Sequence, residues 1–376
     1  MLRPLLSQFV DAKIQSFDCR TQDGYTIGLS RVVRKNAQYD SCNKPTVLVT
    51  HGMTASTDMF VLPETRNFIE FLLDEGFDPW LFDWRGSCRL PYNSRGDSFK
   101  LDDVALYDVP KAVAVVREAI GSKSLYVVAH CVGALVFGQS MTAGLVKGLA
   151  GFVSQGVFLT PKMELRPQLS FSFLSELARP FVGDTLPVDF RKVGFFSRYT
   201  PLFALASIGA KCPDPTCQML HNSAWCMGAS LFEHDNLHKT THDRLAELFG
   251  DVPMAIVPHL RKIVLARSLV AWHEKDPRYQ SLPADSLAAA ETIDCPLLLL
   301  AGSKNALWVD SNKLCENVLN ERFPALNVEY QEIPAYGHFD TFTGQGAAYD
   351  VFPRVSQWIH RIANGANGKT ERNSID

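Results

Sequence analysis

The sequence lacks the features that mark exported, membrane-spanning and nucleic-acid-binding proteins. Residues 1–10 hold a short apolar run broken by Pro4 and Gln8, without the apolar core and cleavage site of a signal peptide. No apolar run approaches the length of about 18 residues that a spanning helix needs, so no transmembrane segment is expected. The net charge is -3 and the basic residues form no cluster, which argues against nucleic acid as a partner.

The nine cysteines are odd in number and lack the spacing of a disulfide framework. Disulfides persist in oxidising compartments, so this pattern predicts free thiols and a cytoplasmic location. Because 46% of the residues are hydrophobic and only 20% are charged, the chain can bury a large core.

Cysteine and histidine are concentrated between residues 212 and 242, which raises the question of a metal site. The gaps between them do not match the short C-x2-C knuckles of structural zinc sites, so we expect packing and helix capping there, with no metal and no cofactor. The residues concerned are Cys212, Cys217, His221, Cys226, His234, His238 and His242.

Apolar runs typical of buried strands alternate with segments of helical periodicity. Strands are predicted at residues 14–20, 25–33, 46–50, 77–84, 124–130, 151–160, 295–302 and 328–333. Helices are predicted near residues 64–75, 103–120 and 348–362. Continuous rather than alternating apolar runs indicate an α/β fold, with a mainly parallel eight-stranded sheet flanked by helices.

The alternation of predicted strands and helices stops after the sixth strand, which indicates an insertion within the core. Residues 1–160 and 293–364 are predicted to form the two parts of one core. Residues 161–292, rich in aromatic side chains and helical patterns, are predicted to be an inserted helical cap. Residues 365–376 are polar and predicted to be a disordered tail.

The segment 127–133 (VVAHCVG) predicts a nucleophile elbow, in which a strand, a sharp turn and a helix expose one side chain above a sheet. Cys131 stands where a serine is usual, and Ala129 replaces the first glycine of G-x-S-x-G. The backbone N–H groups of Val132 and of Met53, which follows another strand, are the expected oxyanion hole. We expect His130 to support the sheet.

His338 follows the last predicted strand and is the expected general base, with a thiolate–imidazolium pair as the resting form. Asn305 is the preferred third member of the triad, because an amide oxygen can accept the imidazole N–H. Asp310 and Asp340 are the alternatives for that role. A Cys-His-Asn set is chemically coherent, since a thiol needs less help than a hydroxyl to lose its proton.

Several segments resemble the α/β-hydrolase superfamily. Residues 76–86 (GFDPWLFDWRG), 107–110 (YDVP) and 338–340 (HFD) resemble the GYDVWLxNxRG, YDLPA and HLDF segments of its acid-lipase-like members. The chain is more similar still to cysteine-elbow hydrolase domains associated with cholesterol-oxidase-like (glucose–methanol–choline) oxidoreductases, whose elbow reads AHCVG. Those domains also share GxxNxxF/W at the end of the strand predicted at residues 295–302. In the cap they share C-x4-C, here Cys212 and Cys217, and H-x-N-L-x3-TH, here residues 234–242.

These observations predict a cysteine hydrolase that acts on a hydrophobic carboxylic ester or thioester through an acyl-enzyme. An acyltransferase or polyester-synthase-like enzyme with the same Cys-His pair is one alternative. A non-catalytic ligand-binding protein on a hydrolase scaffold is another. A thioester substrate implies an acyl carrier as donor, and the resemblance implies an oxidoreductase partner.

Overall fold

The computed structural model describes most of the chain. The described residues are 3–5, 9–35, 44–165, 167–169, 180, 182–194, 196–208, 210, 212–222 and 229–372, with residues 205, 206, 222 and 366–372 described by their backbone alone. Within them, no helix combines the length and the apolar character needed to cross a bilayer.

Eight strands form one sheet, in the order β1-β2-β4-β3-β5-β6-β9-β10. The strands β4, β3, β5, β6, β9 and β10 are mutually parallel, while β2 is antiparallel to both of its neighbours. This topology confirms the fold predicted from the sequence. The strands are β1 (Ala12–Phe17), β2 (Gly28–Arg34), β3 (Thr46–Thr50), β4 (Asp78–Asp83), β5 (Leu125–His130), β6 (Gly151–Gln155), β9 (Leu297–Gly302) and β10 (Val328–Ile333).

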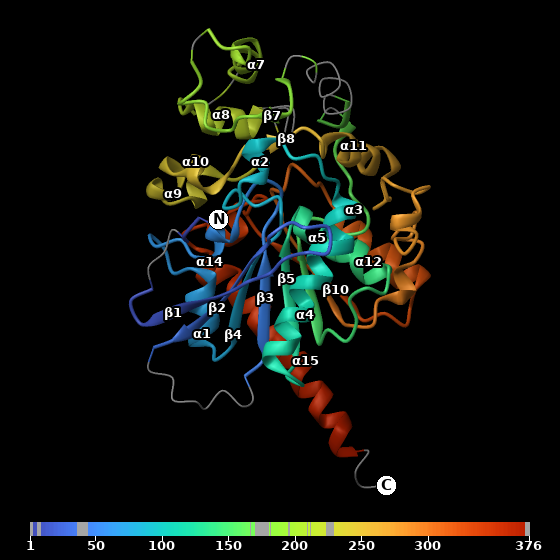
Figure 1. Ribbon diagram of the computed structural model, residues 1–376. Helices are drawn as coiled ribbons and strands as arrows, with labels where there is room; N and C mark the ends of the chain where they lie inside the picture. Colours follow the sequence, from blue (N-terminus) through green and yellow to red (C-terminus); the bar gives the residue numbers. More distant parts are fainter. Residues whose placement is uncertain are drawn as a thin grey trace.

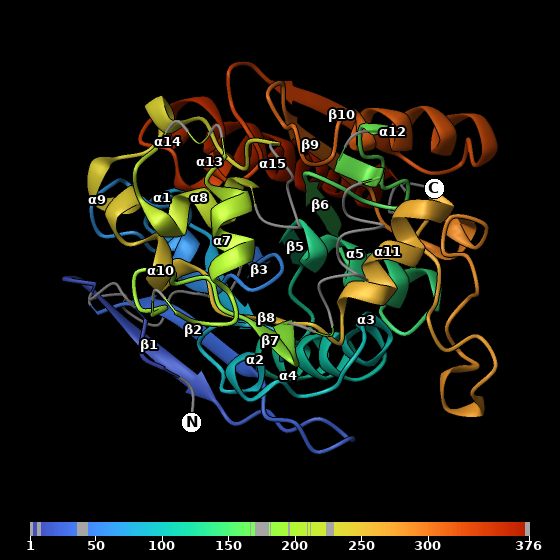
Figure 2. The ribbon, with the colours of Figure 1, turned by 90° about the horizontal axis from the view of Figure 1, so that it is seen from above.

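Helices cover both faces of the sheet, as a parallel sheet requires. On one side lie α1 (Phe68–Asp74) and α15 (Phe352–Arg372), and on the other lie α4 (Val109–Ile120), α5 (Val132–Thr142) and α12 (Ser311–Arg322), as Figure 2 shows. Every residue of α5 is buried. Its small residues allow this close packing, since a Cβ on Gly138 would lie 2.9 Å from the Phe158 ring.

Two element boundaries differ from the prediction for identifiable reasons. The predicted helix 103–120 is three elements: α3 (Leu101–Asp103), a π-helical segment (Val104–Asp108) and α4. Pro110, which lacks a backbone N–H, lies at the second position of α4, directly after the π-helical segment. The sixth strand ends at Gln155, because Gly156 turns the chain with a φ of 95°.

The tail also differs from the prediction, because α15 continues through residues 365–372. A helix already formed on the core extends at the small cost of one residue per added hydrogen bond. Residues 373–376, the rest of the predicted disordered tail, lie outside the described residues.

The segment predicted as a cap lies over the carboxyl ends of the parallel strands (Figure 1). It is not purely helical, since β7 (Thr185–Leu186) pairs antiparallel with β8 (Val252–Pro253). Its helices are α7 (Thr200–Ala206), α8 (Pro215–Asn222), η3 (His234–Asn236), α9 (Lys239–Asp243), α10 (Leu245–Leu248), α11 (Val257–Ala266), η4 (Pro277–Tyr279) and η5 (Ala290–Thr292). Short elements of the core are η1 (Thr57–Phe60), α2 (Tyr92–Arg95), α13 (Asp340–Thr343) and α14 (Ala347–Asp350).

A buried arginine joins the amino-terminal hairpin to the core. The Arg85 guanidinium donates to Asp23 Oδ2 at 2.7 Å and to Asp108 Oδ1 at 2.9 Å, and it lies 4.0 Å from the centre of the Tyr25 ring. Burial raises the pKa of Asp108, while the charge of Arg85 lowers it. The carboxylate therefore depends on this one cation.

Replacing Arg85 should destabilise the protein strongly, because Arg85→Met leaves the Asp108 carboxylate buried without its cation. We expect the free energy of unfolding to fall by about 3–5 kcal/mol in urea titrations. The control is Arg95→Met, which removes an ion pair with Asp97 whose arginine side chain is 57% exposed. Its cost should stay below about 1 kcal/mol, and equal costs for the two variants would contradict the interpretation.

Candidate active site

Cys131 lies in the sharp turn between β5 and α5 that the sequence predicts. Its φ of 54° and ψ of -123° form a strained backbone conformation for a residue with a Cβ. The Cys131 N–H donates to Gln155 O at 2.9 Å, which fixes the turn to β6. Only a glycine fits at position 133, since a Cβ there would lie 2.5 Å from His51 O. The surrounding backbone thus holds the thiol at the carboxyl edge of the sheet.

The two predicted oxyanion donors face the same atom. The backbone N–H groups of Met53 and Val132 both approach the Cys131 sulfur. A residue of another segment holds the loop that carries Met53, because the indole N–H of Trp84, which follows β4, donates to His51 O at 3.1 Å. Two backbone N–H donors therefore converge beside the thiol, as an oxyanion hole requires.

His338 lies in the loop after β10 and reaches the thiol. Its ring nitrogens, those of His130 and the Cys131 sulfur form a group in which one atom from each residue lies within 4.8 Å of the others. Both His338 ring nitrogens are buried, and neither has a hydrogen-bond partner among the residues that the structure describes. The ring packs on Gly156, where a Cβ would lie 2.5 Å from His338 Cε1. The backbone N–H of His338 donates to Leu231 O of the cap at 3.2 Å.

Burial controls the charge state of this pair. It raises the pKa of the Cys131 thiol to about 11, although the nearby N–H groups lower it. Burial and the neighbouring His130 hold the pKa of His338 well below its usual value. The resting pair is therefore a neutral thiol beside a neutral imidazole. Both directions oppose the thiolate–imidazolium form expected from the sequence, because desolvation penalises both charges.

The structure does not give His338 the third partner that the sequence predicts. Asn305 Oδ1 accepts the Trp308 N–H at 3.1 Å, and its Nδ2 donates to Gly156 O at 3.4 Å. Asn305 therefore supports the backbone under the His338 ring and makes no hydrogen bond with the ring itself. The Asn305 amide therefore contacts residues that surround His338 and does not take the expected place beside its ring nitrogens.

The two alternative residues have other roles. Asp310 begins α12 and forms an ion pair with Lys162 at 3.3 Å, with 56% of its side chain exposed. Asp340 is buried and accepts the Gly337 N–H at 3.0 Å and Asn236 Nδ2 at 2.6 Å. Asp340 thus fixes the loop that carries His338.

Two neighbours of the pair have larger roles than the sequence indicated. His130 makes the expected supporting contact, a hydrogen bond with the Gln155 side chain, but its ring also lies 4.7 Å from the His338 ring. Burial lowers the pKa of His130 to about 4, so it is neutral at pH 7. Trp308 lines the same pocket as Cys131, and its side chain lowers the pKa of the thiol. The aromatic position of the GxxNxxF/W pattern was the signal that could have identified Trp308.

A deep apolar pocket opens onto the thiol beneath the cap. The oxyanion loop, the elbow and the His338 loop form its floor, and aliphatic side chains of the cap form its walls. Two aromatic residues of the first part of the cap pack against each other outside this lining: Phe190 stacks with Phe203 at 5.3 Å. The wall residues include Met163, Leu186, Val188, Met219, Leu220, Val252, Leu260 and Val264.

Comparisons with known proteins agree with this architecture. Two family models match the chain: "alpha/beta hydrolase fold" over residues 45–180, and "partial alpha/beta-hydrolase lipase region" over residues 5–64. Lipase member K of Mus musculus is 25% identical over 364 residues, covering 92% of this chain and 87% of that protein. Lysosomal acid lipase/cholesteryl ester hydrolase of Rattus norvegicus is 26% identical, covering 89% and 86%.

Solved structures show the same fold at lower identity. A lipase in its open form has a TM-score of 0.56 and 17% identity, covering 94% of this chain and all of that one. A thermostable carboxyl esterase from Bacillus coagulans has a TM-score of 0.56 and 13% identity, with coverages of 94% and 98%.

The neutral resting pair predicts how Cys131 reacts with iodoacetamide, whose carbon is attacked by the thiolate, with loss of iodide, and not by the neutral thiol. Because the thiol titrates near pH 11, its alkylation rate should rise about tenfold per pH unit between pH 7 and pH 9. Mass spectrometry of the peptide that contains Cys131 gives this rate. A plateau reached below pH 7 would instead reveal the ion pair.

Gly156→Ala should displace the His338 ring. On the expectation from the sequence that Cys131 is the nucleophile and His338 its base, acylation of Cys131 should slow about 100-fold, as misplacement of a catalytic group by about 1 Å does. The matched control is Gly76→Ala, because Gly76 also has a positive φ, of 82°, but has open space around its Cβ direction. Both variants carry backbone strain, so both should lose some thermal stability. Acylation is measured by release of p-nitrophenol, and equal rates in the two variants would refute the packing argument.

Proposed function

Because models of the α/β-hydrolase fold match residues 45–180 and acid lipases are among the relatives, we propose that the chain is an α/β hydrolase that cleaves a hydrophobic carboxylic ester or thioester through an acyl-enzyme on Cys131. The main support for this proposal is the position of the Cys131 sulfur. Two convergent N–H groups lie on one side of it and an imidazole lies within 4.8 Å. The apolar pocket above supports a hydrophobic acyl chain as the part of the substrate that binds.

In the first half-reaction, the carbonyl oxygen of the substrate accepts the N–H groups of Met53 and Val132. His338 takes the thiol proton while the Cys131 sulfur forms a bond with the carbonyl carbon. The tetrahedral intermediate then collapses, its C–O or C–S bond to the leaving group breaks, and His338 returns the proton to the departing alcohol or thiol. The product is a thioester on Cys131.

In the second half-reaction, His338 removes a proton from water while the water oxygen attacks the thioester carbon. The C–S bond to Cys131 breaks, the carboxylic acid leaves, and the sulfur regains its proton from His338. The enzyme returns to the neutral pair from which it began.

The neutral resting pair suits this route. Neither group carries a charge before substrate binds, so the site tolerates burial under an apolar cap. Charge develops only during attack, on the oxygen that faces the two fixed N–H donors. The imidazolium that forms lacks a carboxylate partner at its ring nitrogens. A thiol loses its proton more easily than a hydroxyl, so it depends less on that partner.

The apolar pocket and the proposed thioester on Cys131 also support acyl transfer as a second candidate function. A dry, apolar pocket slows attack by water on the thioester, and an acceptor alcohol or thiol that binds in the pocket can take the acyl group instead. The oxidoreductase partner, the acyl carrier and the cytoplasmic location stay proposals that rest on the sequence.

Intact-mass spectrometry after addition of p-nitrophenyl esters tests the acyl-enzyme directly. We expect a mass increase of one acyl group on Cys131 that neutral hydroxylamine removes, because hydroxylamine cleaves thioesters readily. His338→Ala should slow acylation about 100-fold or more, as loss of a general base does. An adduct that persists in Cys131→Ala would place the nucleophile elsewhere. No adduct in the wild type, with tight binding of the ester, would favour the non-catalytic alternative.

Cys131→Ser discriminates between a site built for a thiol and one that tolerates either nucleophile. With no carboxylate at His338, a hydroxyl should acylate at least about 100-fold more slowly than the thiol. The volume change is small, so thermal stability serves as the control and should stay close to that of the wild type. Full activity of the serine variant would show that the thiol is not required.

A further inference from the structure

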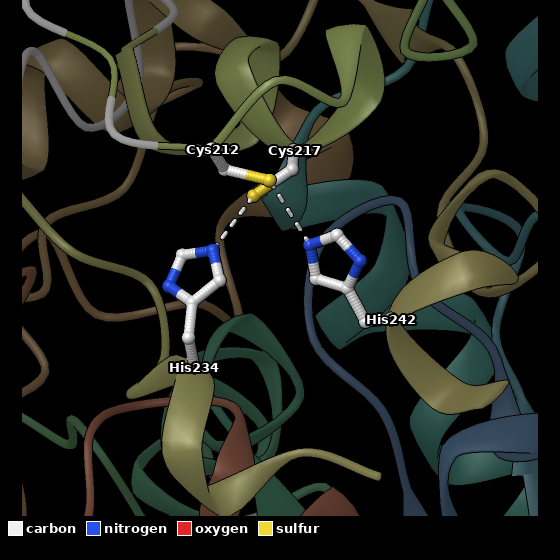
Figure 3. A group of neighbouring side chains, drawn as sticks. All are labelled: Cys212, Cys217, His234 and His242. Carbon is white, nitrogen blue, oxygen red and sulfur yellow. Dashed lines mark hydrogen bonds between the residues drawn. The ribbon is translucent and has the colours of Figure 1, made fainter. Parts of the chain in front are cut away.

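Four side chains of the cap converge at a point outside the pocket. Cys212 Sγ lies 3.4 Å from His242 Nε2, and Cys217 Sγ lies 3.2 Å from His234 Nε2. All four ligand-type atoms lie within 4.8 Å of one another, and Figure 3 shows both sulfurs and both imidazoles directed toward a common centre. The short gaps of a zinc knuckle are not needed, because the side chains come from separate segments.

Local contacts hold these segments in place. Asp214 Oδ1 accepts the Cys217 N–H at 2.9 Å, and Gln218 Nε2 donates to Cys212 O at 2.8 Å. His238 Nδ1 accepts the Thr240 N–H at 3.2 Å and so caps the start of α9, which carries His242. The prediction of a capping role was therefore right for His238. The four converging side chains need a different explanation.

The donor set matches one class of metal ion. Two thiolates and two imidazoles are a usual ligand set for structural zinc, with Zn–S near 2.3 Å and Zn–N near 2.0 Å. A tetrahedron with those bonds has S···N edges of about 3.5 Å, close to the two distances observed. Because the group contains no carboxylate, it is unsuited to calcium or magnesium. The charge of Zn²⁺ is balanced by two thiolates.

We propose that Cys212, Cys217, His234 and His242 bind one Zn²⁺ ion in the cap. On binding, each thiol releases its proton to solvent and each imidazole donates a ring-nitrogen lone pair, giving a neutral four-coordinate site. His234 is exposed while Cys217 is buried, so the ion has a path from solvent to a partly enclosed position. The absence of an open coordination position makes the site structural rather than catalytic.

The site also lies next to the loop that carries His338. The ring of Phe232 lies 5.1 Å from the His234 ring and 6.3 Å from the His242 ring. Its neighbour Leu231 provides the carbonyl that accepts the His338 N–H. The ion would therefore fix the part of the cap that supports His338. An effect of the ion on activity rests on the proposed function, whereas zinc binding itself does not.

Metal analysis of the full chain, purified and then equilibrated with Zn²⁺ and dialysed, tests the proposal. We expect about one zinc per chain in the wild type and in Cys131→Ala, which separates this test from that of the acyl-enzyme. Cys212→Ser and His242→Asn should lose the ion. Cys88→Ser and His360→Asn, which change the same residue types outside the cluster, should retain it. Loss of zinc in these controls as well, or a metal-free wild type, would overturn the proposal.

A cobalt experiment does not depend on the folding of any variant. Substitution of the wild-type site with Co²⁺ should give the intense ligand-field absorption of tetrahedral cobalt together with thiolate charge-transfer bands. A weak octahedral spectrum without those bands would contradict the ligand set. A disulfide between Cys212 and Cys217, detected by non-reducing peptide mapping of freshly purified protein, would also refute it.

Discussion

Desolvation of a thiol and an imidazole is the constraint on which the site depends. Cys131 and His338 are both buried, and burial raises the pKa of the first and lowers that of the second. Both shifts favour the uncharged pair. A strained turn at Cys131 and a glycine beneath His338 supply the geometry, and the cap supplies apolar side chains around the pocket. Reactivity in such a site comes from preorganised donors rather than from a stored charge.

The parts of the site that the sequence predicted are those encoded by adjacent residues. The elbow at Cys131 follows from a buried strand, a turn and a helix of small residues, all within a short segment. The strands at Thr46–Thr50 and Val328–Ile333 agree with the predicted bounds for the same reason. Local patterns carry this information because strand burial and helix packing impose periodicity on neighbouring residues.

The parts that the sequence could not predict depend on which of several available partners a polar group or a short strand meets in the folded chain. The oxygen of Asn305 meets the Trp308 N–H rather than His338, a choice set by the turn after β9. The pairing of Thr185–Leu186 with Val252–Pro253 involves strands too short to have a period. Sequence gaps likewise gave no indication that Cys212 and His242 would meet, since separate segments of the cap bring them together.

The carbonyl of Leu231 links the cap to the chemistry below it. It accepts the backbone N–H groups of both His338 and Phe339, at 3.2 and 2.9 Å. Because a single carbonyl accepts both amides, displacement of Leu231 would break both hydrogen bonds together and leave the backbone at His338 and Phe339 without this anchor. The position of the imidazole is therefore coupled to the position of the cap.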